Sequence, residues 1–166
     1  MAAVTISIPQ SGKYENADAV DRVIYYICRL DKPELIRGMG VYPFTAEDMV
    51  SEFYKVKDFY RKEGGKQIFH IIFSFDKYLF TAEECVGIGY KIAEYWGDER
   101  QVVFAVHDDT ENLHIHMGIN TVAYTNGNYK AFFPIEEIRE FVEPIIQEAI
   151  YAKWFHEKTI EADGKI

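Results

Sequence analysis

Three of the five histidines in the chain lie close together, at positions 107, 114 and 116. One apolar residue separates His114 from His116, so on a β-strand both imidazoles project from the same face. His107 ends an apolar run, and the segment between it and His114 has the Asp, Thr, Glu and Asn residues typical of turns. A hairpin would bring the three imidazoles together. Such a set suits a divalent metal ion that keeps positions open for substrate oxygens.

The alternative is that these histidines are structural. Each buried imidazole needs a polar partner, and three at this spacing across one hairpin rarely arise by packing alone. We therefore predict that His107, His114 and His116 are the metal ligands. His70 is flanked by apolar residues in the strand predicted for residues 68–75, and we interpret it as a core histidine outside the ligand set.

The pattern His-x-Asp-x-x-x-x-His-x-His-x-x-x-Asn at residues 107–120 resembles the metal-binding motif of the relaxase/mobilisation nuclease family, of the HUH endonuclease type. These enzymes nick one DNA strand at a transfer origin, so that a plasmid or integrative element can be conjugated. Residues 69–75 with 81–84, and residues 25–27 with 31–32, resemble two further segments of that family. The resemblance covers residues 15–132.

The resemblance implies that a tyrosine attacks a DNA phosphodiester and forms a 5′-phosphotyrosine. Tyr25 and Tyr26 are the candidates, on a helix predicted for residues 17–30. Consecutive helical side chains diverge by about 100°, so at most one of the two points into a given site. Tyr26 borders the apolar stripe of this helix, as a nucleophile or simply as a rim residue of the core, whereas Tyr25 points nearly opposite. This agrees with the family in favouring Tyr26.

Other residues of the motifs have predicted roles. Asp109 could orient an imidazole or accept the tyrosine proton, and we favour orientation. The resemblance implies that Ser74 contacts the DNA or the scissile phosphate, although serine at a strand end is also ordinary turn chemistry. Asn120 fixes either a strand or a ligand. We expect Mn²⁺ or Mg²⁺, with Zn²⁺ and Ni²⁺ as alternatives. Imidazole admits Mn²⁺, Zn²⁺ and Ni²⁺ readily whereas Mg²⁺ prefers oxygen, so the sequence leaves the identity of the ion open.

A basic and aromatic segment lies at the end of the helix predicted for residues 45–62. Aromatic rings interleaved with cations suit single-stranded nucleic acid, since bases stack on rings while cations meet phosphates. A solvated helix end is the alternative. The predicted DNA-binding cations of this segment are Lys55, Lys57, Arg61, Lys62 and Lys66.

Composition limits the other possibilities. With 166 residues and 48% hydrophobic content, we predict one domain over residues 1–156 and a frayed tail over 157–166. The net charge of −9 argues against nonspecific coating of nucleic acid. Two cysteines without metal-like spacing fit a reducing compartment, and no leader or apolar span is visible, so we expect a cytoplasmic protein without a membrane segment.

The predicted order is strand, helix, helix, strand, helix, three strands and a helix. It implies an α+β fold with a central, mostly antiparallel sheet flanked by helices, and the resemblance implies the same palm-like architecture. Residues 33–44 are predicted to be a loop over the active site. Residues 125–128 should form a tight turn, followed by a strand at 129–132 and a helix at 134–156.

Two other functions remain open at this point. A rolling-circle replication initiator would use the same chemistry, and a non-catalytic DNA-binding or assembly protein could keep the fold, as the acidic charge suggests. The expected partners are single-stranded DNA at a transfer origin, accessory DNA-binding proteins and a coupling protein. The chain could be a fragment of a longer relaxase or a small stand-alone enzyme.

Overall fold

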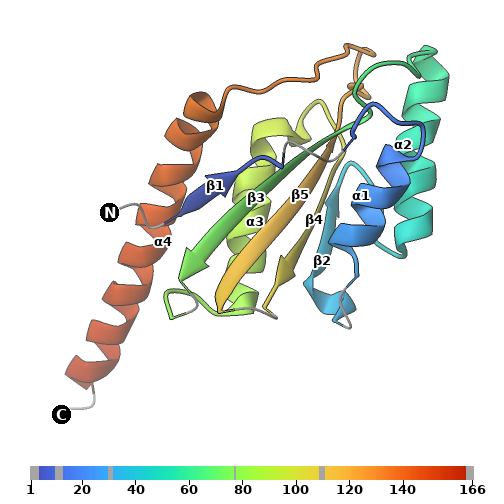
Figure 1. Cartoon of the computed structure of the whole chain (residues 1–166). Helices are drawn as coiled ribbons and strands as arrows, with labels where there is room; N and C mark the ends of the chain where they lie inside the picture. Colours follow the sequence, from blue (N-terminus) through green and yellow to red (C-terminus); the bar gives the residue numbers. More distant parts are fainter. Residues whose placement is uncertain (1–3, 10–12, 30–31, 77, 109–110, 164–166) are drawn as a thin grey trace.

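A computed structural model describes residues 4–9, 13–29, 32–76, 78–108 and 111–163 of the protein. Five strands form one sheet in the order β1-β3-β5-β4-β2, and every neighbouring pair is antiparallel (Figure 1). The strands are β1 (Thr5–Ser7), β2 (Ile36–Met39), β3 (Ile68–Asp76), β4 (Val102–His107) and β5 (Asn112–Asn120). The helices are α1 (Ala19–Ile27), α2 (Ala46–Tyr60), α3 (Ala82–Gly97) and α4 (Ile135–Asp163), with a 3-10 turn at Pro33–Leu35. The predicted α+β architecture is confirmed.

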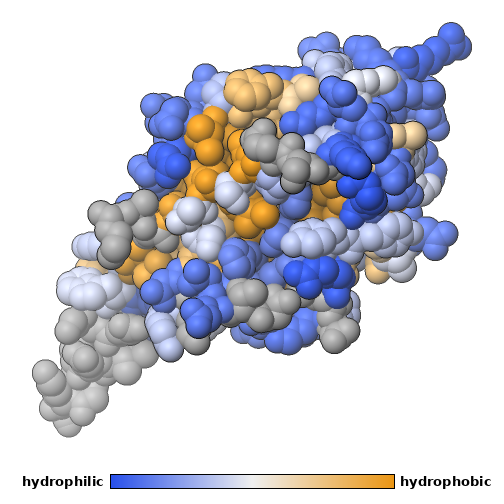
Figure 2. Space-filling view, viewed as in Figure 1, coloured by the Kyte–Doolittle hydropathy of each residue, from blue (hydrophilic) through white to orange (hydrophobic). Residues whose placement is uncertain are grey.

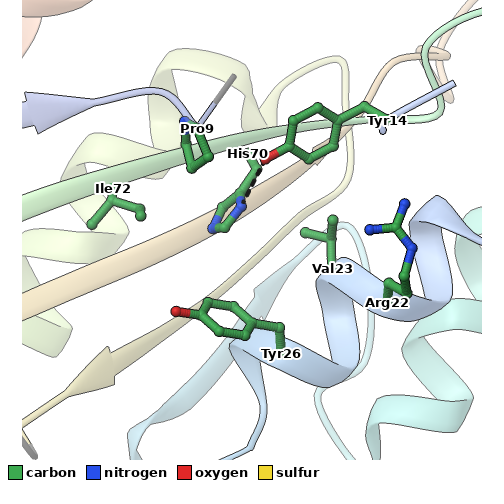
Figure 3. A pocket seen from close by; sticks show the side chains of 7 residues that line it. All are labelled: Pro9, Tyr14, Arg22, Val23, Tyr26, His70 and Ile72. Atoms are coloured by element: carbon green, nitrogen blue, oxygen red, sulfur yellow. Dashed lines mark hydrogen bonds between the residues drawn. The ribbon is translucent and has the colours of Figure 1, made fainter. Parts of the chain in front are cut away.

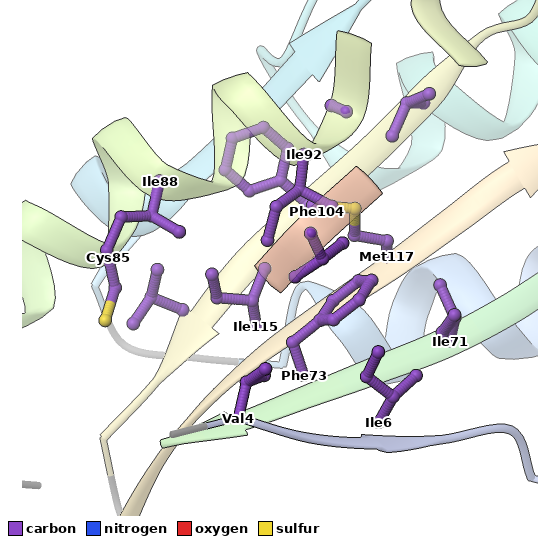
Figure 4. Close-up of a cluster of buried hydrophobic side chains, with 14 of the residues drawn as sticks. Val4, Ile6, Ile71, Phe73, Cys85, Ile88, Ile92, Phe104, Ile115 and Met117 are labelled. Carbon is purple, nitrogen blue, oxygen red and sulfur yellow. The ribbon is translucent and has the colours of Figure 1, made fainter. Parts of the chain in front are cut away.

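The alternation of side chains along the central strands separates the sheet into two different faces. One face is apolar and packs against α3 and α4, where Phe73, Phe104 and Ile115 meet Ile88 and Ile92 of α3 (Figure 4). Helix α3 can lie close to this face because Gly89 has no side chain. A Cβ at this position would collide with the ring of Phe104. This large core holds the central strands in register.

Helices α1 and α2 cover the other face only in part. Val20 and Ile24 of α1 and Phe53 of α2 pack against Ile68 and Val103 of the sheet. Helix α1 contacts β5, β3 and β4, and α2 packs beside α1, whereas in Figure 1 no helix lies in front of β1. Figure 2, seen from the same side, shows apolar side chains reaching the surface among polar ones in this uncovered part. The sheet therefore has one closed face and one half-open face.

Caps begin the two middle helices where the sequence predicts them. The Thr45 side chain accepts a hydrogen bond from the backbone N–H of Asp48 at the start of α2. Thr81 and Glu84 form a reciprocal capping box at the start of α3. Both helices close within two residues of the predicted ends, which is the usual uncertainty of such boundaries.

Three expectations about elements are wrong. The sequence predicts residues 36–39 as part of a loop over the active site, but they form the edge strand β2. Their backbone pairs with that of β4, whose N–H and C=O groups on this side would otherwise have no strand to pair with. Residues 129–132 form no strand, and only an isolated bridge joins Val122 to Tyr129. Helix α4 continues to Asp163, past the end predicted at His156 and through most of the segment expected to fray.

No described helix combines the length and apolar character that a membrane span requires.

Candidate active site

The predicted hairpin forms and brings the three histidines together. His107 of β4 lies directly opposite His114 of β5, and His116 lies opposite Ala105 on the same face. The rings of His107 and His116 stack with centroids 4.0 Å apart, and the rings of His114 and His116 are 6.1 Å apart. All three side chains line one pocket of about 280 Å³ on the half-open face. The spacing argument made from the sequence is confirmed in its geometry.

The donor chemistry of this pocket fits a divalent ion, but the ring orientations do not yet form a coordination sphere. The His107 Nε2 atom lies 2.8 Å from the carbonyl oxygen of Ile27. Since a carbonyl can only accept, Nε2 carries a proton, and in the neutral ring Nδ1 is the atom with the lone pair. Over the described residues, no three His, Cys, Asp or Glu side chains have the arrangement of a ligand cluster. Binding one ion to stacked imidazoles at about 2.0–2.1 Å requires the rings to turn toward each other.

Burial lowers the pKa of two of the imidazoles on this face. Burial, with the neighbouring His107 as the next cause, lowers the pKa of His116 to about 2. The same two causes lower the pKa of His70 to about 4. Both rings are therefore uncharged at neutral pH, and an uncharged imidazole is the form that can donate a lone pair to a metal.

His70 is buried, as the sequence indicates, but its side chain lies on the same face of the sheet as His114 and His116. Its Nε2 atom is 3.4 Å from Nδ1 of His116, and its Nδ1 atom is 3.4 Å from the hydroxyl of Tyr14. His70 and Ser74 are four residues apart on β3, so both point to the face that carries the histidines of β5. The period of two along this strand was the signal that could have placed His70 beside the ligand set.

The structure places Tyr26 against the histidines. Its ring centroid is 5.5 Å from that of His116, 6.0 Å from that of His70 and 6.3 Å from that of His107. The side chain is 46% exposed and lines the histidine pocket. Tyr25 is equally exposed, at 48%, but is not among the described residues that line this pocket. The divergence of consecutive helical residues thus separates the two tyrosines as predicted.

Arg29 is a site residue that the sequence reasoning missed. It lines the same pocket, and its guanidinium carbon lies 4.9 Å from the centroid of the Tyr26 ring. Its spacing of three residues from Tyr26 was the available signal, because residues three apart share a helix face. A fixed positive charge beside the tyrosine suits a phosphate group.

The remaining predicted motif residues divide into two groups. Ser74 pairs with His114 across β3 and β5 and lines the pocket, as expected for a residue near the substrate. Asp109 lies outside the described residues. Its neighbour Asp108 forms a 2.7 Å ion pair with Lys32, which ties the end of β4 to the segment after α1.

Asn120 is a structural residue away from the pocket. It is fully buried, and its side-chain amide donates to the Phe53 carbonyl at 3.2 Å and to Gln101 Oε1 at 2.9 Å. Its side-chain oxygen accepts from the backbone N–H of Val122 at 3.0 Å. Of the two roles left open by the sequence, the geometry supports the fixing of a strand.

Lys57 does not belong to the DNA-binding cluster, and its assignment there is wrong. It is 1% exposed, and its ammonium group donates to the Gln67 carbonyl at 2.7 Å and to Thr121 Oγ1 at 3.2 Å. Burial, followed by the charge of Arg100, lowers the pKa of Lys57 to about 8. The helical pattern turns this lysine inward, where no phosphate can reach it.

The other four cations of the segment differ in their surroundings. Lys55 and Arg61 are exposed. Lys62 donates to the carbonyl of Gly127. Lys66 is half-buried and lies 5.3 Å from the centroid of the Tyr14 ring, whose hydroxyl faces His70.

Comparison with known proteins gives a family match and a similar fold. The family model described as Relaxase, MobA/VirD2-like, nuclease domain matches residues 26–149. A solved structure from work on the molecular basis of vancomycin resistance transfer in Staphylococcus aureus has a similar fold, with a TM-score of 0.51. That likeness has 14% sequence identity and covers 71% of this chain and 70% of the other. No curated protein matches the sequence.

Proposed function

Since the chain belongs to the relaxase family, whose nuclease-domain model matches most of its length, we propose that it nicks one DNA strand at a transfer origin. The proposed reaction is a metal-dependent transesterification with Tyr26 as the nucleophile. The observation that carries this proposal is the position of Tyr26. Its ring centroid lies within 6.3 Å of the ring centroids of His70, His107 and His116, and its side chain is half-exposed to solvent.

The residues around Tyr26 supply what a phosphodiester substrate needs. Arg29 would neutralise a phosphate oxygen, and the Ser74 hydroxyl would donate a hydrogen bond to the same group. His107, His114 and His116 would hold a divalent ion, which supplies polarisation of the phosphate and stabilises the charge that develops on its oxygens. Asp109 would fix the orientation of an imidazole through its second ring nitrogen.

The reaction exchanges one ester for another. The Tyr26 oxygen forms a bond to phosphorus as it loses its proton, and the bond from phosphorus to the 3′ oxygen of the neighbouring nucleotide breaks. The leaving oxygen takes up a proton and becomes a free 3′-hydroxyl. No water is consumed, so the step is reversible and the same protein can rejoin the strand.

The match to a relaxase nuclease-domain model favours mobilisation over replication as the role of this chemistry. The net charge of −9 does not conflict with DNA binding at this place, because cations lie around the pocket. These are Arg22, Arg29, Lys32 and Lys66. In this proposal the partners are single-stranded DNA, accessory DNA-binding proteins and a coupling protein.

Replacement of each tyrosine tests the proposal. Wild-type protein incubated with Mn²⁺ and a pool of single-stranded oligonucleotides should become covalently attached to the 5′ side of a cleaved strand. An excess of the 3′-hydroxyl fragment should release it again. Tyr26→Phe removes one oxygen and should form no adduct while still binding DNA, whereas the matched control Tyr25→Phe should react as the wild type does.

Two results would contradict this assignment. An adduct that persists in Tyr26→Phe and disappears in Tyr25→Phe would move the nucleophile by one residue. Cleavage that gives water-derived ends in both variants would make the protein a metal-dependent nuclease without a tyrosine intermediate.

A further inference from the structure

We propose that a second pocket beside Tyr26 binds a single nucleobase of the DNA strand, next to the nucleotide whose phosphate lies at the histidines. This inference rests on the proposed function and adds the part of the substrate that the site recognises. The pocket has a volume of about 380 Å³ and lies between α1 and the strands β1 and β3 (Figure 3). Its lining residues are Pro9, Tyr14, Arg22, Val23, Tyr26, His70 and Ile72.

The two pockets are neighbours in space. Tyr26 and Ile72 line both of them, so one wall of the histidine pocket is also a wall of the second pocket. In Figure 3 the rings of Tyr14 and Tyr26 lie on opposite sides of His70. A strand whose phosphate lies at the histidines would therefore pass its next base directly into this second pocket.

The lining has the chemistry of a base-binding site. Its walls are aromatic or aliphatic, and bases gain binding energy by stacking on aromatic side chains whatever their sequence. The Tyr14 hydroxyl lies 3.4 Å from Nδ1 of His70, whose Nε2 faces His116, so the free lone pair of the Tyr14 oxygen can accept a hydrogen bond from the edge of a base. Such a combination of apolar walls and a few convergent polar groups is typical of small-molecule pockets.

Positive charge lies on both sides of the pocket, where the flanking phosphates would be. Arg29 stands on the histidine side, against Tyr26. Arg22 lines the pocket itself and also forms an ion pair with Asp18, and Lys66 lies over the ring of Tyr14. Apolar walls between cations fit a base with a phosphate on either side better than an apolar peptide side chain, which carries no such charges.

Equilibrium binding tests this pocket without relying on cleavage. A single-stranded DNA library is selected for binding to Tyr26→Phe protein with Mn²⁺, since this variant keeps the ring that lines the pocket. Each nucleotide of the selected oligonucleotide is then replaced in turn by an abasic one, and binding is measured by fluorescence anisotropy. Removal of one particular base should weaken binding roughly 5- to 150-fold, the range expected for loss of base stacking.

Filling the pocket should remove that sensitivity. Val23→Trp and Pro9→Trp, each added to Tyr26→Phe, should weaken binding of the complete oligonucleotide, while the abasic version binds no worse than before. Tyr25→Trp is the matched control on the outer side of α1 and should leave the abasic effect intact. Val23 is buried and its variant could fail to fold, but Pro9 is only half-buried and lies outside the core clusters, so Pro9→Trp keeps the test open.

The outcomes separate this inference from the proposed function. An abasic effect of unchanged size in the filled variants, or no base-sensitive position at all, overturns the base pocket even if wild-type protein forms the tyrosine adduct. A base-sensitive position that disappears on filling supports the pocket even if no adduct forms, in which case only the transesterification fails. A protein that selects no single-stranded DNA overturns both.

Discussion

Two polar clusters lie on the same face of the sheet, and β5 runs through both. At one end, Asn120 of β5 and Lys57 of α2 are buried between the helix and the sheet and donate hydrogen bonds to backbone carbonyls and side chains. At the other end, His114 and His116 line a pocket that is open to solvent beside the end of α1. His116 and Asn120 are only four residues apart on one strand, so local structure alone does not make them different.

The difference lies in what packs above each cluster. Helix α2 closes the Asn120 end, and a polar group under a helix must be hydrogen-bonded or the fold loses stability. Helix α1 ends at Ile27 and leaves a pocket at the histidine end, with the half-exposed Tyr26 at its edge, although His107 and His116 are themselves buried. The closed cluster therefore contributes to stability, the open one is the proposed ligand site, and each variant below should affect only one of these two properties.

The largest expected effect is the loss of metal binding in His114→Ala. Removing one of three imidazole donors should weaken Mn²⁺ binding by more than about 100-fold, since even supporting residues behind ligands are worth about 10- to 100-fold. The side chain is half-buried at the pocket, so the free energy of unfolding should change by less than about 0.5 kcal/mol. Calorimetric titration with Mn²⁺ measures this, with the exposed His156→Ala as control. Unchanged affinity in His114→Ala would mean that the motif is structural.

Asn120→Ala should give the opposite result. It removes the donor to Phe53 and Gln101 and the acceptor for Val122, which leaves buried polar groups without partners. We expect the protein to lose about 2–4 kcal/mol of unfolding free energy, while Mn²⁺ affinity stays the same. Urea unfolding measures the loss, and the exposed Asn128→Ala is the control. A metal defect in a folded Asn120→Ala protein would place this residue in the site after all.

Lys57→Met should produce a stability loss that depends on pH. At pH 7 it should cost about 1–3 kcal/mol through the lost hydrogen bonds to Gln67 and Thr121. The pKa of Lys57 is lowered to about 8 in the folded protein, so the unfolded chain binds its proton more tightly. Between pH 8 and about 10.5 the wild type should therefore gain up to about 3 kcal/mol that the variant lacks.

This contribution of Lys57 is complete above the unfolded pKa and is lost as the pH falls to the folded value. Comparing urea unfolding of wild type and variant at several pH values removes the shared effect of other groups. Lys55→Met, an exposed change on the same helix, should show no such trend. A difference between wild type and Lys57→Met that stays constant from pH 7 to 10.5 would argue against the lowered pKa.

The smallest effect should come from the exposed cations of the α2 end. Replacing both Lys55 and Arg61 with Glu should weaken binding of single-stranded DNA and make its log–log salt slope shallower by about 1.4, for two phosphate contacts. The control Lys91→Glu with Arg139→Glu changes the net charge equally on the helices of the closed face. If both pairs behave alike, the α2 end is an ordinary solvated helix terminus.

Local periodicity determined much of this protein from its sequence. The period of two along β5 places His114 and His116 on one face, and turn residues after His107 place the third ring beside them. The helical angle between consecutive residues separates Tyr26 from Tyr25. Such features depend on neighbours within a few residues, so they can be predicted before any packing is known.

Only the tertiary structure decided which polar side chains are covered. Lys57 lies on a basic helix end and Asn120 on a functional motif, and both proved to be buried because α2 packs over the end of the sheet. His70 joined the site, since β3 pairs with β5 and sets its ring against His116. Strand pairing and helix coverage join residues far apart in the chain, and the short-range patterns of a sequence do not record which distant segment will lie above them.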